Sequence, residues 1–360
     1  MKLIHPRGIA VVKKTVWNRF GLMVLSFSLC IFCRVYSLPE PPLHPLQPTF
    51  LSNGSYSEAY EISAVLEDGT FIQTQMMVTN IGLKDSNAVC QLLVLRKGDA
   101  PLNNSKRFGK TEWNYSDTPN QALSIGHCRI EQAAGSTVCT MSFKNASVVV
   151  SFNEPVNPVK TPSTLNVGTE KDLQQGKSSS NFYTYTVLIP WSSLKATMRI
   201  REKPEIESSG SGIMVRSRTV GYPKNFSWGW VYYYGCPTGC RFLADFRFPP
   251  HGAGAVAGWV WKDNEPEPQP VTGMQVTYGS TVIDGKKMTS VVVSSPDSSF
   301  TITSRYELYR FSVIEDLGPI LGSIIKLAIG NPVTRFYQAQ VVQSPVDTAE
   351  VGVLEVMRFE

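Results

Sequence analysis

The segment EAYEISAVLEDGTFIQTQMMVT, Glu58–Thr79, has the pattern of two β-strands joined by a tight turn. The pair Asp68-Gly69 separates the two runs, and an Asp-Gly pair accepts the positive φ angles that a two-residue hairpin turn requires. The same pair recurs at Asp284-Gly285, between two further runs that contain β-branched residues. We therefore expect antiparallel hairpins at both places.

Alternation of apolar and polar residues predicts further strands. Within Leu194–Arg201 every second side chain is apolar, which is typical of a strand with one buried and one solvated face. Four more segments resemble strands: Val148–Phe152, Tyr183–Ile189, Phe300–Phe311 and Val351–Phe359. Helical spacing occurs only in Ile314–Ile329, where Pro319 restricts the helix to about residues 319–329. The many short strands predict an all-β protein of sandwiches or barrels.

The length of 360 residues predicts two domains, because single hydrophobic cores stop growing at about 250 to 300 residues. The short stretch Lys203–Gly212, rich in Ser and Gly, is the expected boundary, and it divides the chain into residues 53–204 and 205–360. Each half has the size of one β-barrel. The polar segment Glu154–Asn181 is expected to be a surface insertion or flap.

The net charge of +5 is concentrated at the N-terminus, where six Lys and Arg residues precede any acid. No basic block remains downstream, which argues against nucleic acid as a partner. The cations precede a short apolar run, Phe20–Cys33, which predicts a signal peptide over residues 1–37 with cleavage near Ser37. We expect a secreted or periplasmic protein with a Pro-rich tether over residues 38–52. The alternative is an uncleaved signal anchor that holds the protein at a membrane.

Five cysteines follow the expected cleavage site. The segment HCRIEQAAGSTVC predicts a hairpin with Cys128 opposite Cys139, while Cys236 and Cys240 flank a turn, so that each pair can form a disulfide in an oxidising compartment. The alternative is that these are buried free thiols. Cys90 lies in an apolar run and is expected to be a core thiol. No metal site is expected, because the spacings match no zinc motif.

The motifs of common catalytic and nucleotide-binding sites do not occur in the sequence. It contains no Gly-X-Ser-X-Gly, Gly-X-Gly-X-X-Gly or His-Glu-X-X-His, and its one Cys-X-X-Cys, Cys30–Cys33, lies within the expected signal peptide. We therefore expect no cofactor, and no side chain stands out as a catalytic nucleophile.

The segment FSWGWVYYYGCPTGCRFLADFRF, Phe226–Phe248, contains nine aromatic residues. As a strand pair, it presents two rows of rings: Trp228, Trp230, Tyr232 and Tyr234 on the first strand, and Phe242 and Phe246 on the second. We expect these rows to form an aromatic wall of a ligand cavity, because Trp and Tyr join a large apolar body to one polar tip. Trp259 and Trp261 are expected in another wall strand. The alternative is that the rings fill the barrel or form an exposed adhesive patch.

Two carboxyl groups are candidate acid catalysts. If Asp245 points into the barrel, burial raises its pKa while Arg241 or Arg247 lowers it, a combination found at acid catalysts. The outward direction is favoured, because the phenylalanines of that strand need burial, and Asp245 then forms a surface ion pair of little energetic consequence. Glu61, in the first hairpin, is the second candidate.

The order of these pieces resembles the survival-factor, AttH and CrtC-like family. The resemblance is carried by EAYEISAVLEDGTFIQTQMMVTNIGL, VLIPWSSLKATMRI, GSGIMVRSRTVGYPKNFSWGWVYYYG and the ending IIKLAIGNPVTRFYQAQVV with GVLEVMRFE, and it extends over about residues 55–360. It implies two consecutive lipocalin-like (calycin) antiparallel β-barrels. Ala59–Ile62 replaces the Trp-rich opening strand of the hydratase-like members, so no catalytic residue is carried over. Trp228 and Trp230 match the family's second-barrel Trp strand and are implied as pocket residues.

The resemblance implies chemistry on hydrophobic ligands, and three functions follow from it and from the sequence. The first is an exported binding protein that holds a lipid-like or isoprenoid-like molecule in an aromatic cavity. The second is a cofactor-independent hydratase, cyclase or isomerase that acts on an apolar isoprenoid-like or polyketide-like substrate, with Asp245 or Glu61 as the acid. The third is a structural or adhesive β-protein without a ligand. The expected partner is a hydrophobic small molecule or lipid, and transient membrane contact is left open.

Overall fold

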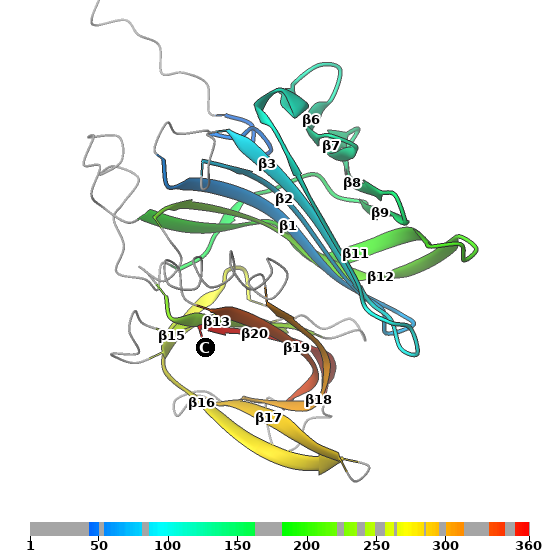
Figure 1. The fold of residues 1–360 in the computed structure, drawn as a ribbon. Coiled ribbons are helices and arrows are strands. Elements are labelled where there is room, and N and C mark those ends of the chain that lie inside the picture. The colour runs from blue at the N-terminus through cyan, green and yellow to red at the C-terminus, as the bar shows by residue number, and fades with distance from the viewer. Residues whose placement is uncertain are drawn as a thin grey trace, which may run out of the picture. The chain divides into compact units, whose positions relative to one another are not determined.

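In the computed structural model, the strands of the chain all lie within one unit, Pro45–Glu360. The structure describes residues 43–49, 54–80, 86–162, 182–221, 227–235, 242–248, 256–262, 265–283, 286–294, 300–312, 331–342 and 350–359. Apart from one short 3-10 helix, Lys110–Glu112, the regular structure in these ranges consists of β-strands. The strands form two antiparallel sheets (Figure 1), which confirms the predicted all-β class.

The first sheet has twelve strands. They are β1 (Tyr56–Leu66), β2 (Phe71–Thr79), β3 (Asn87–Leu95), β4 (Leu102–Phe108), β5 (Trp113–Ser116), β6 (Gln121–Ile125), β7 (Cys128–Ala133), β8 (Ser136–Phe143), β9 (Ala146–Phe152), β10 (Val159–Lys160), β11 (Phe182–Ile200) and β12 (Ile206–Val220). Their order is β4-β3-β2-β1-β12-β11-β9-β8-β7-β6-β5, and β10 pairs with β11. The sheet curves around one core, because Cys90 Sγ of β3 lies 3.7 Å from the carbonyl oxygen of Ile125 in β6.

The first predicted hairpin is confirmed as β1 and β2. The backbone N–H of Leu66 donates to the carbonyl of Thr70 at 2.9 Å, so three residues form the loop instead of the expected two. Gly69 has a φ of 79°, and the backbone N–H of Thr70 donates to Asp68 Oδ1 at 2.9 Å. This is the three-residue hairpin loop in which a left-handed glycine ends a turn.

The expected domain boundary at Lys203–Gly212 is wrong. Strand β11 turns at residues 201–203 into β12, which pairs with both β11 and β1 and therefore belongs to the first sheet. The glycines of this stretch do not form a flexible linker but allow neighbouring strands to approach closely. A Cβ added to Gly210 would lie 2.4 Å from the carbonyl oxygen of Val65. The last strand of the first sheet ends at Val220, and the first strand of the second sheet begins at Gly229.

The second sheet is a closed barrel of eight strands in sequential order. They are β13 (Gly229–Gly235), β14 (Phe242–Phe248), β15 (Val256–Lys262), β16 (Gln269–Ile283), β17 (Lys286–Ser294), β18 (Thr301–Ser312), β19 (Pro332–Val342) and β20 (Glu350–Phe359). The pairing of Ile283 with Lys286 confirms the second predicted hairpin. A closed barrel removes the exposed edges of an open sheet.

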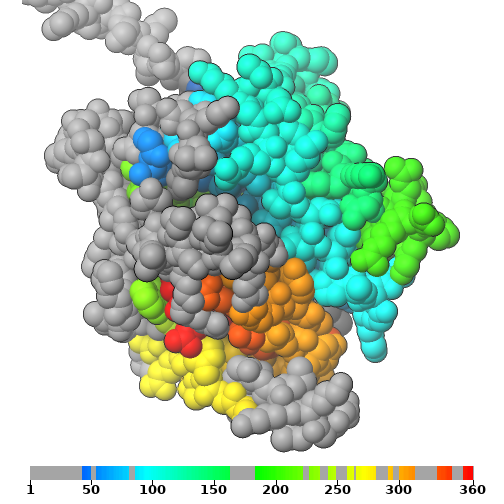
Figure 2. Space-filling view, viewed as in Figure 1, coloured from blue at the N-terminus to red at the C-terminus, as the bar shows by residue number. Residues whose placement is uncertain are grey.

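Each sheet encloses its own core, and a third apolar cluster joins the two sheets. The first core contains residues such as Tyr60, Ile62 and Phe152, and the barrel core is described below. The joining cluster includes Phe71, Trp191 and Ile213 from the first sheet, together with Trp259, Tyr234 and other residues of the barrel. In the space-filling view the strands of the two sheets form adjoining masses (Figure 2).

Part of the expected Pro-rich tether is packed against the first sheet. Leu46 is fully buried in the first core, and Arg216 of β12 donates to the carbonyl oxygens of Pro45 and Gln47 at 3.1 Å each. Arg216 Nε also donates to the buried Glu58 at 2.6 Å. Residues 45–49 are therefore part of the folded unit, because a buried ion pair and an apolar contact hold them.

The predicted Cys128–Cys139 disulfide is wrong, and Cys90, Cys128 and Cys139 are buried free thiols. The hairpin exists, but its turn lies at Ala134 and Gly135, whose φ angles are 46° and 83°. A tight hairpin turn of this type needs positive φ at both central residues, so it is centred where the glycine is. Cys139 consequently faces Ile130. The expectation that Cys90 is a core thiol is confirmed.

Several expectations lie outside the described residues: the signal peptide over 1–37, the Cys236–Cys240 disulfide and the helix near 319–329. They stay predictions. Among the residues that the structure describes, there is no helix of sufficient length and hydropathy to cross a membrane.

Candidate functional site

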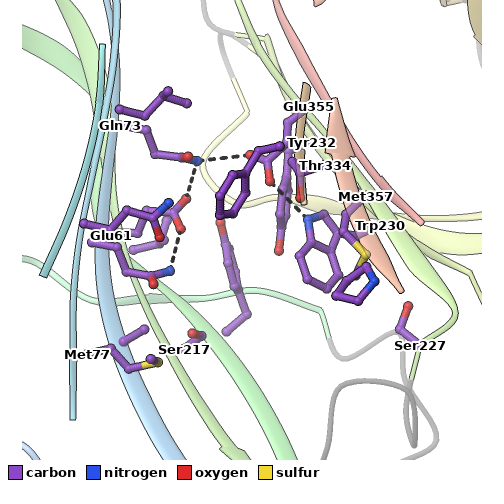
Figure 3. A pocket seen from close by; sticks show the side chains of 18 of the residues that line it. Glu61, Gln73, Met77, Ser217, Ser227, Trp230, Tyr232, Thr334, Glu355 and Met357 are labelled. Atoms are coloured by element: carbon purple, nitrogen blue, oxygen red, sulfur yellow. Dashed lines mark hydrogen bonds between the residues drawn. The ribbon is translucent and has the colours of Figure 1, made fainter. Parts of the chain in front are cut away.

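A cavity of about 370 Å³ lies between the two sheets (Figure 3). The first sheet contributes residues of β1, β2, β3, β4, β11 and β12, among them Glu61, Gln73, Gln75, Gln91 and Tyr183. The barrel contributes residues of β13, β14, β18, β19 and β20, among them Trp230, Tyr232, Arg247, Phe336 and Glu355. This volume lies within the range of small-molecule sites, and both sheets are needed to form it.

The cavity between the sheets lies outside the interior of the second barrel, where the sequence placed the ligand site, and described side chains of the barrel pack together in that interior. Phe242 and Phe246 are fully buried in the barrel core, where each contacts the ring of Phe300 at 5.2 and 6.3 Å between centroids. These two phenylalanines pack in the barrel core and do not line the cavity between the sheets, so their assignment as ligand-binding residues stays a prediction. The core also contains Tyr233 and Val231 from β13.

The register of β13 and β14 explains this arrangement. Trp230 pairs with Arg247 and Tyr232 pairs with Asp245, and residues directly opposite each other on antiparallel strands point to the same face. The Trp/Tyr row of β13 therefore shares a face with the charged row of β14, and the phenylalanines lie on the other face. The expected two-stranded aromatic wall does not form.

The remaining aromatic candidates divide into cavity and contact residues. Trp230 and Tyr232 line the cavity. Tyr234, Trp259 and Trp261 belong to the apolar cluster that joins the sheets. Trp228 is not among the lining residues: it is 36 % exposed, and its ring contacts Phe359 at 5.7 Å.

Two carboxyl groups from different sheets are connected in the cavity by one amide. Gln73 Nε2 donates to Glu61 Oε1 at 3.2 Å and to Glu355 Oε2 at 3.0 Å (Figure 3). Gln75 Nε2 donates to the other oxygen of Glu61 at 3.4 Å, and Trp230 Nε1 donates to Glu355 Oε1 at 3.2 Å. Because an amide nitrogen carries two hydrogens, Gln73 holds both carboxyl groups in place at once.

The pKa of both carboxyl groups is raised. Burial raises the pKa of Glu61 from 4.5 to about 8; the Glu355 carboxyl adds to this, while hydrogen bonds from Gln75 and Gln73 and the charge of Arg247 oppose it. Burial also raises the pKa of Glu355. Two neighbouring carboxyl groups in a poorly solvated site do not ionise together easily, so we expect at least one proton on the pair near neutral pH.

Asp245 and Arg247 form a buried ion pair beside these groups. Asp245 is 3 % and Arg247 5 % exposed. Arg247 Nε lies 3.0 Å from Asp245 Oδ1, and Nη2 donates to Oδ2 at 3.2 Å. Asp245 points out of the barrel as favoured, but it is buried instead of exposed to solvent, so the expectation of a surface pair is wrong. Burial, with Glu355 and Glu61, raises the pKa of Asp245.

Aromatic rings surround the guanidinium of Arg247. Its carbon lies 4.7 Å from the ring centre of Tyr232, 5.1 Å from Tyr183 and 5.2 Å from Trp230. Nη2 donates to Tyr183 Oη at 2.6 Å and also to Tyr232 Oη. Tyr185 stacks on Tyr232 with 6.0 Å between ring centres. The cation is thus held rigidly in an apolar environment that strengthens its electrostatic interactions.

Comparison with solved structures places the fold. A crystal structure of a protein from Nitrosomonas europaea that carries the name AttH is 11 % identical, with a TM-score of 0.60, over 90 % of this chain and 99 % of that one. CghA with Sch210972 is 8 % identical, with a TM-score of 0.55, over 90 % and 96 %. The chain has the tandem-barrel fold of AttH-like proteins. Kievitone hydratase from Nectria haematococca is 9 % identical, with a TM-score of 0.48, over 88 % and 93 %. Neither a family model nor a curated protein matches the sequence.

Within this AttH-like fold the sequence identified only some of the site. Glu61, Asp245, Trp230 and Tyr232 were candidates: Glu61, Trp230 and Tyr232 line the cavity, and Asp245 contacts the lining residue Arg247. Glu355 and Gln73 were missed. Glu355 carried a detectable signal, because it is the single charged residue within the apolar run Val351–Met357. Gln73 carried none, since polar residues are ordinary on one face of a strand.

The arrangement is suited to proton transfer. Carboxyl groups with raised pKa values can donate and accept protons near neutral pH, and the surrounding rings can contact an apolar molecule. Among the described residues, no group of three or more His, Cys, Asp or Glu side chains is arranged to hold a metal ion.

Proposed function

We propose that this protein binds a mostly apolar small molecule in the cavity between its sheets and catalyses acid–base chemistry on it, with Glu61 as the principal proton donor and acceptor. The observation that carries the proposal is the Gln73 amide, which holds the buried carboxyl groups of Glu61 and Glu355 together at the cavity wall. Isomerisation, hydration and cyclisation are reactions that such a pair can promote.

A carboxyl group whose pKa is close to the working pH is efficient in both directions of proton transfer. Burial and the charge of Glu355 raise the pKa of Glu61 to about 8, so Glu61 is mainly protonated at neutral pH and can act as an acid. After donation, its carboxylate can take a proton from another position of the substrate. Gln73 and Gln75 keep both oxygens of Glu61 oriented during the exchange.

The cavity favours an apolar ligand with few polar groups. Aromatic and aliphatic side chains such as Phe336, Tyr309 and Met357 line it beside Trp230 and Tyr232. Burial of apolar surface contributes about 25 cal/mol of free energy per Å², but it does not fix the orientation of the ligand. The few polar groups of the cavity fix that orientation. These same features favour the second candidate function, a carrier that binds the molecule without changing it.

The Kemp elimination of 5-nitrobenzisoxazole tests the catalytic proposal without knowledge of the natural substrate. A carboxylate removes the C3 proton, the C–H electron pair forms the nitrile, the N–O bond breaks, and a coloured nitrophenolate is released. We expect the wild-type rate to rise with pH and to have a midpoint near 8, because the ionised form of Glu61 is the base. Glu61→Gln should lower kcat/KM by about a hundredfold or more.

The matched control is Glu205→Gln, which changes an exposed carboxyl group outside the cavity. It should leave the rate and the pH profile unchanged. Quenching of tryptophan fluorescence by the same compound measures binding separately. Equal rates for wild type and Glu61→Gln, with binding intact in both, would remove Glu61 as the base and leave the carrier function.

A further inference from the structure

Arg247 is the only basic side chain among the described residues that line the cavity. It lies on β14 and is 5 % exposed, and its contact with Asp245 and its stacking against three rings restrict its position. The burial of a charged guanidinium in a protein interior costs free energy, because the group loses its hydration. The acid–base reaction proposed for Glu61 does not by itself require it.

The hydrogen bonds of Arg247 point to a role for Tyr232. The hydroxyl oxygen of Tyr232 accepts from Arg247 Nη2, and Tyr232 also lines the cavity. A hydroxyl that accepts a hydrogen bond keeps its own hydrogen as a donor, and acceptance from a cation strengthens that donor. Because Nη2 already donates to Tyr183, Tyr232 and Asp245, the Tyr232 hydroxyl is the donor that this arrangement offers at the cavity wall, and the guanidinium places a positive charge beside it.

A hydrogen-bond donor binds an oxygen atom of a ligand and not a positively charged nitrogen. The carboxyl groups of the cavity restrict the charge that this ligand can carry. Glu61 and Glu355 lie in the same cavity, and the Asp245 carboxylate already contacts Arg247. A ligand with a permanent negative charge would be repelled whenever these groups ionise. An oxygen that is neutral on arrival and gains negative charge during the reaction avoids this repulsion.

We propose that Arg247 and Tyr232 receive the carbonyl, enol or phenol oxygen of a conjugated apolar ligand and stabilise the negative charge that develops on it. This inference rests on the proposed function, in which Glu61 transfers the proton. It names the substrate class: an apolar molecule with an enolisable carbonyl or an equivalent acidic hydroxyl. Preorganised donors at a developing oxyanion are among the largest contributions to catalysis.

The corresponding reaction is balanced without any oxidant or reductant. The Glu61 carboxylate removes a proton from the carbon next to the carbonyl group. The C–H electron pair forms a carbon–carbon double bond, and the carbonyl π pair moves to the oxygen, which accepts a hydrogen bond from the Tyr232 hydroxyl beside the positive charge of Arg247. Glu61 then returns its proton to another carbon of the conjugated system, so that the product is an isomer of the substrate.

Binding of 2-naphthol and 2-methoxynaphthalene tests the inference. The two compounds have the same aromatic skeleton, and only 2-naphthol can become an oxyanion, whose absorption band differs from that of the neutral form. We expect wild type to bind 2-naphthol about ten- to a hundredfold more tightly, because hydrogen bonds from charged groups are worth about 1.5–3 kcal/mol. The naphtholate band should appear in the complex at a lower pH than in free solution.

Arg247→Met and Tyr232→Phe should each reduce the preference for 2-naphthol and move the naphtholate band toward its position in free solution. Tyr232→Phe removes one oxygen only, so it serves if Arg247→Met unfolds, and thermal unfolding followed by circular dichroism monitors the fold of both. Equal affinity of wild type for the two compounds, without a naphtholate band, would overturn the inference and leave the proposed function intact. Failure of both compounds to bind, together with failure of the Kemp elimination, would overturn both.

Discussion

Glu61 should make the stability of this protein depend on pH in a direction opposite to that of an ordinary paired carboxylate. Burial raises its pKa in the folded state from 4.5 to about 8. A carboxyl group with a raised pKa contributes its full stability below the unfolded value, and that contribution is lost as the pH rises through the folded value. Wild type should therefore lose stability between about pH 5 and pH 9.

The size of this loss follows from the change in pKa. A rise from 4.5 to about 8, at about 1.4 kcal/mol for each pH unit, gives an upper limit of roughly 5 kcal/mol. Glu61 keeps partial exposure toward the cavity and interacts with Glu355, so we expect about 2–3 kcal/mol in practice. This is a large fraction of the 5–15 kcal/mol that is typical of a folded domain.

The variant Glu61→Gln removes the titrating group and keeps the approximate shape of the side chain. Urea unfolding of wild type and variant at pH 5 and pH 9, followed by tryptophan fluorescence, gives the free energy of unfolding of each. The difference between the two proteins should be small at pH 5, and the variant should be more stable than wild type at pH 9 by about 2–3 kcal/mol. Glu205→Gln, at an exposed position, is the control and should follow wild type.

A parallel pH dependence of wild type and Glu61→Gln would refute this reasoning, because it would mean that Glu61 ionises without cost in the folded protein. A variant that is less stable than wild type at pH 9 would refute it as well. Neither result depends on the identity of a ligand, so the electrostatics of the site can be tested before its chemistry.

The structure makes two further predictions about stability. Arg216→Met should cost about 3–5 kcal/mol in the free energy of unfolding, because it leaves the fully buried Glu58 without its cation and releases residues 45–49; Asp99→Asn, which breaks an exposed ion pair, should cause no measurable change in the same urea titration. Gly258→Ala should destabilise the barrel by about 1–3 kcal/mol or more, because the new Cβ would lie 1.9 Å from the backbone oxygen of Asp245. Gly54→Ala, with open space around the Cβ, is its control, and equal melting temperatures of the two variants would contradict the crowding argument.

The sequence predicted the strands of this fold well because their signals are local. The alternation in Leu194–Arg201 and the Asp-Gly hairpin signals depend on neighbouring residues, and the strand and both hairpins are confirmed. The domain boundary was mistaken for an equally local reason. Ser and Gly are frequent in linkers, but in β12 the glycines at 210 and 212 fit where neighbouring strands approach too closely for a Cβ.

The site was predictable only in part, because it depends on strand register. The sequence correctly placed Trp230 and Tyr232 on one face of β13, since alternation fixes the face. Which residues of β14 share that face depends on the length of the connection after Gly235. One residue more would have placed Trp230 opposite Phe246 and one residue fewer opposite Phe248, and in either case the predicted aromatic wall would have resulted. Gln73 and Glu355, which form a hydrogen bond, are 282 residues apart in the sequence, so no local sequence pattern predicts their contact.

The position of the cavity follows from the alternation that builds the barrel. The inward side chains of a closed barrel pack in its interior, and Tyr233, Phe242 and Phe246 do so here. In an isolated barrel, the rings and charged groups on the outer face of β13 and β14 would face solvent. An ion pair between Asp245 and Arg247 would then contribute little to stability. Covering that row with β1, β2, β11 and β12 removes water from it, raises the pKa of Glu61, Glu355 and Asp245, and makes Arg247 electrostatically effective. The electrostatics of the site therefore arise from the contact between two sheets that each enclose their own core. A change that loosens their contact should weaken the perturbed pKa values before it unfolds either sheet.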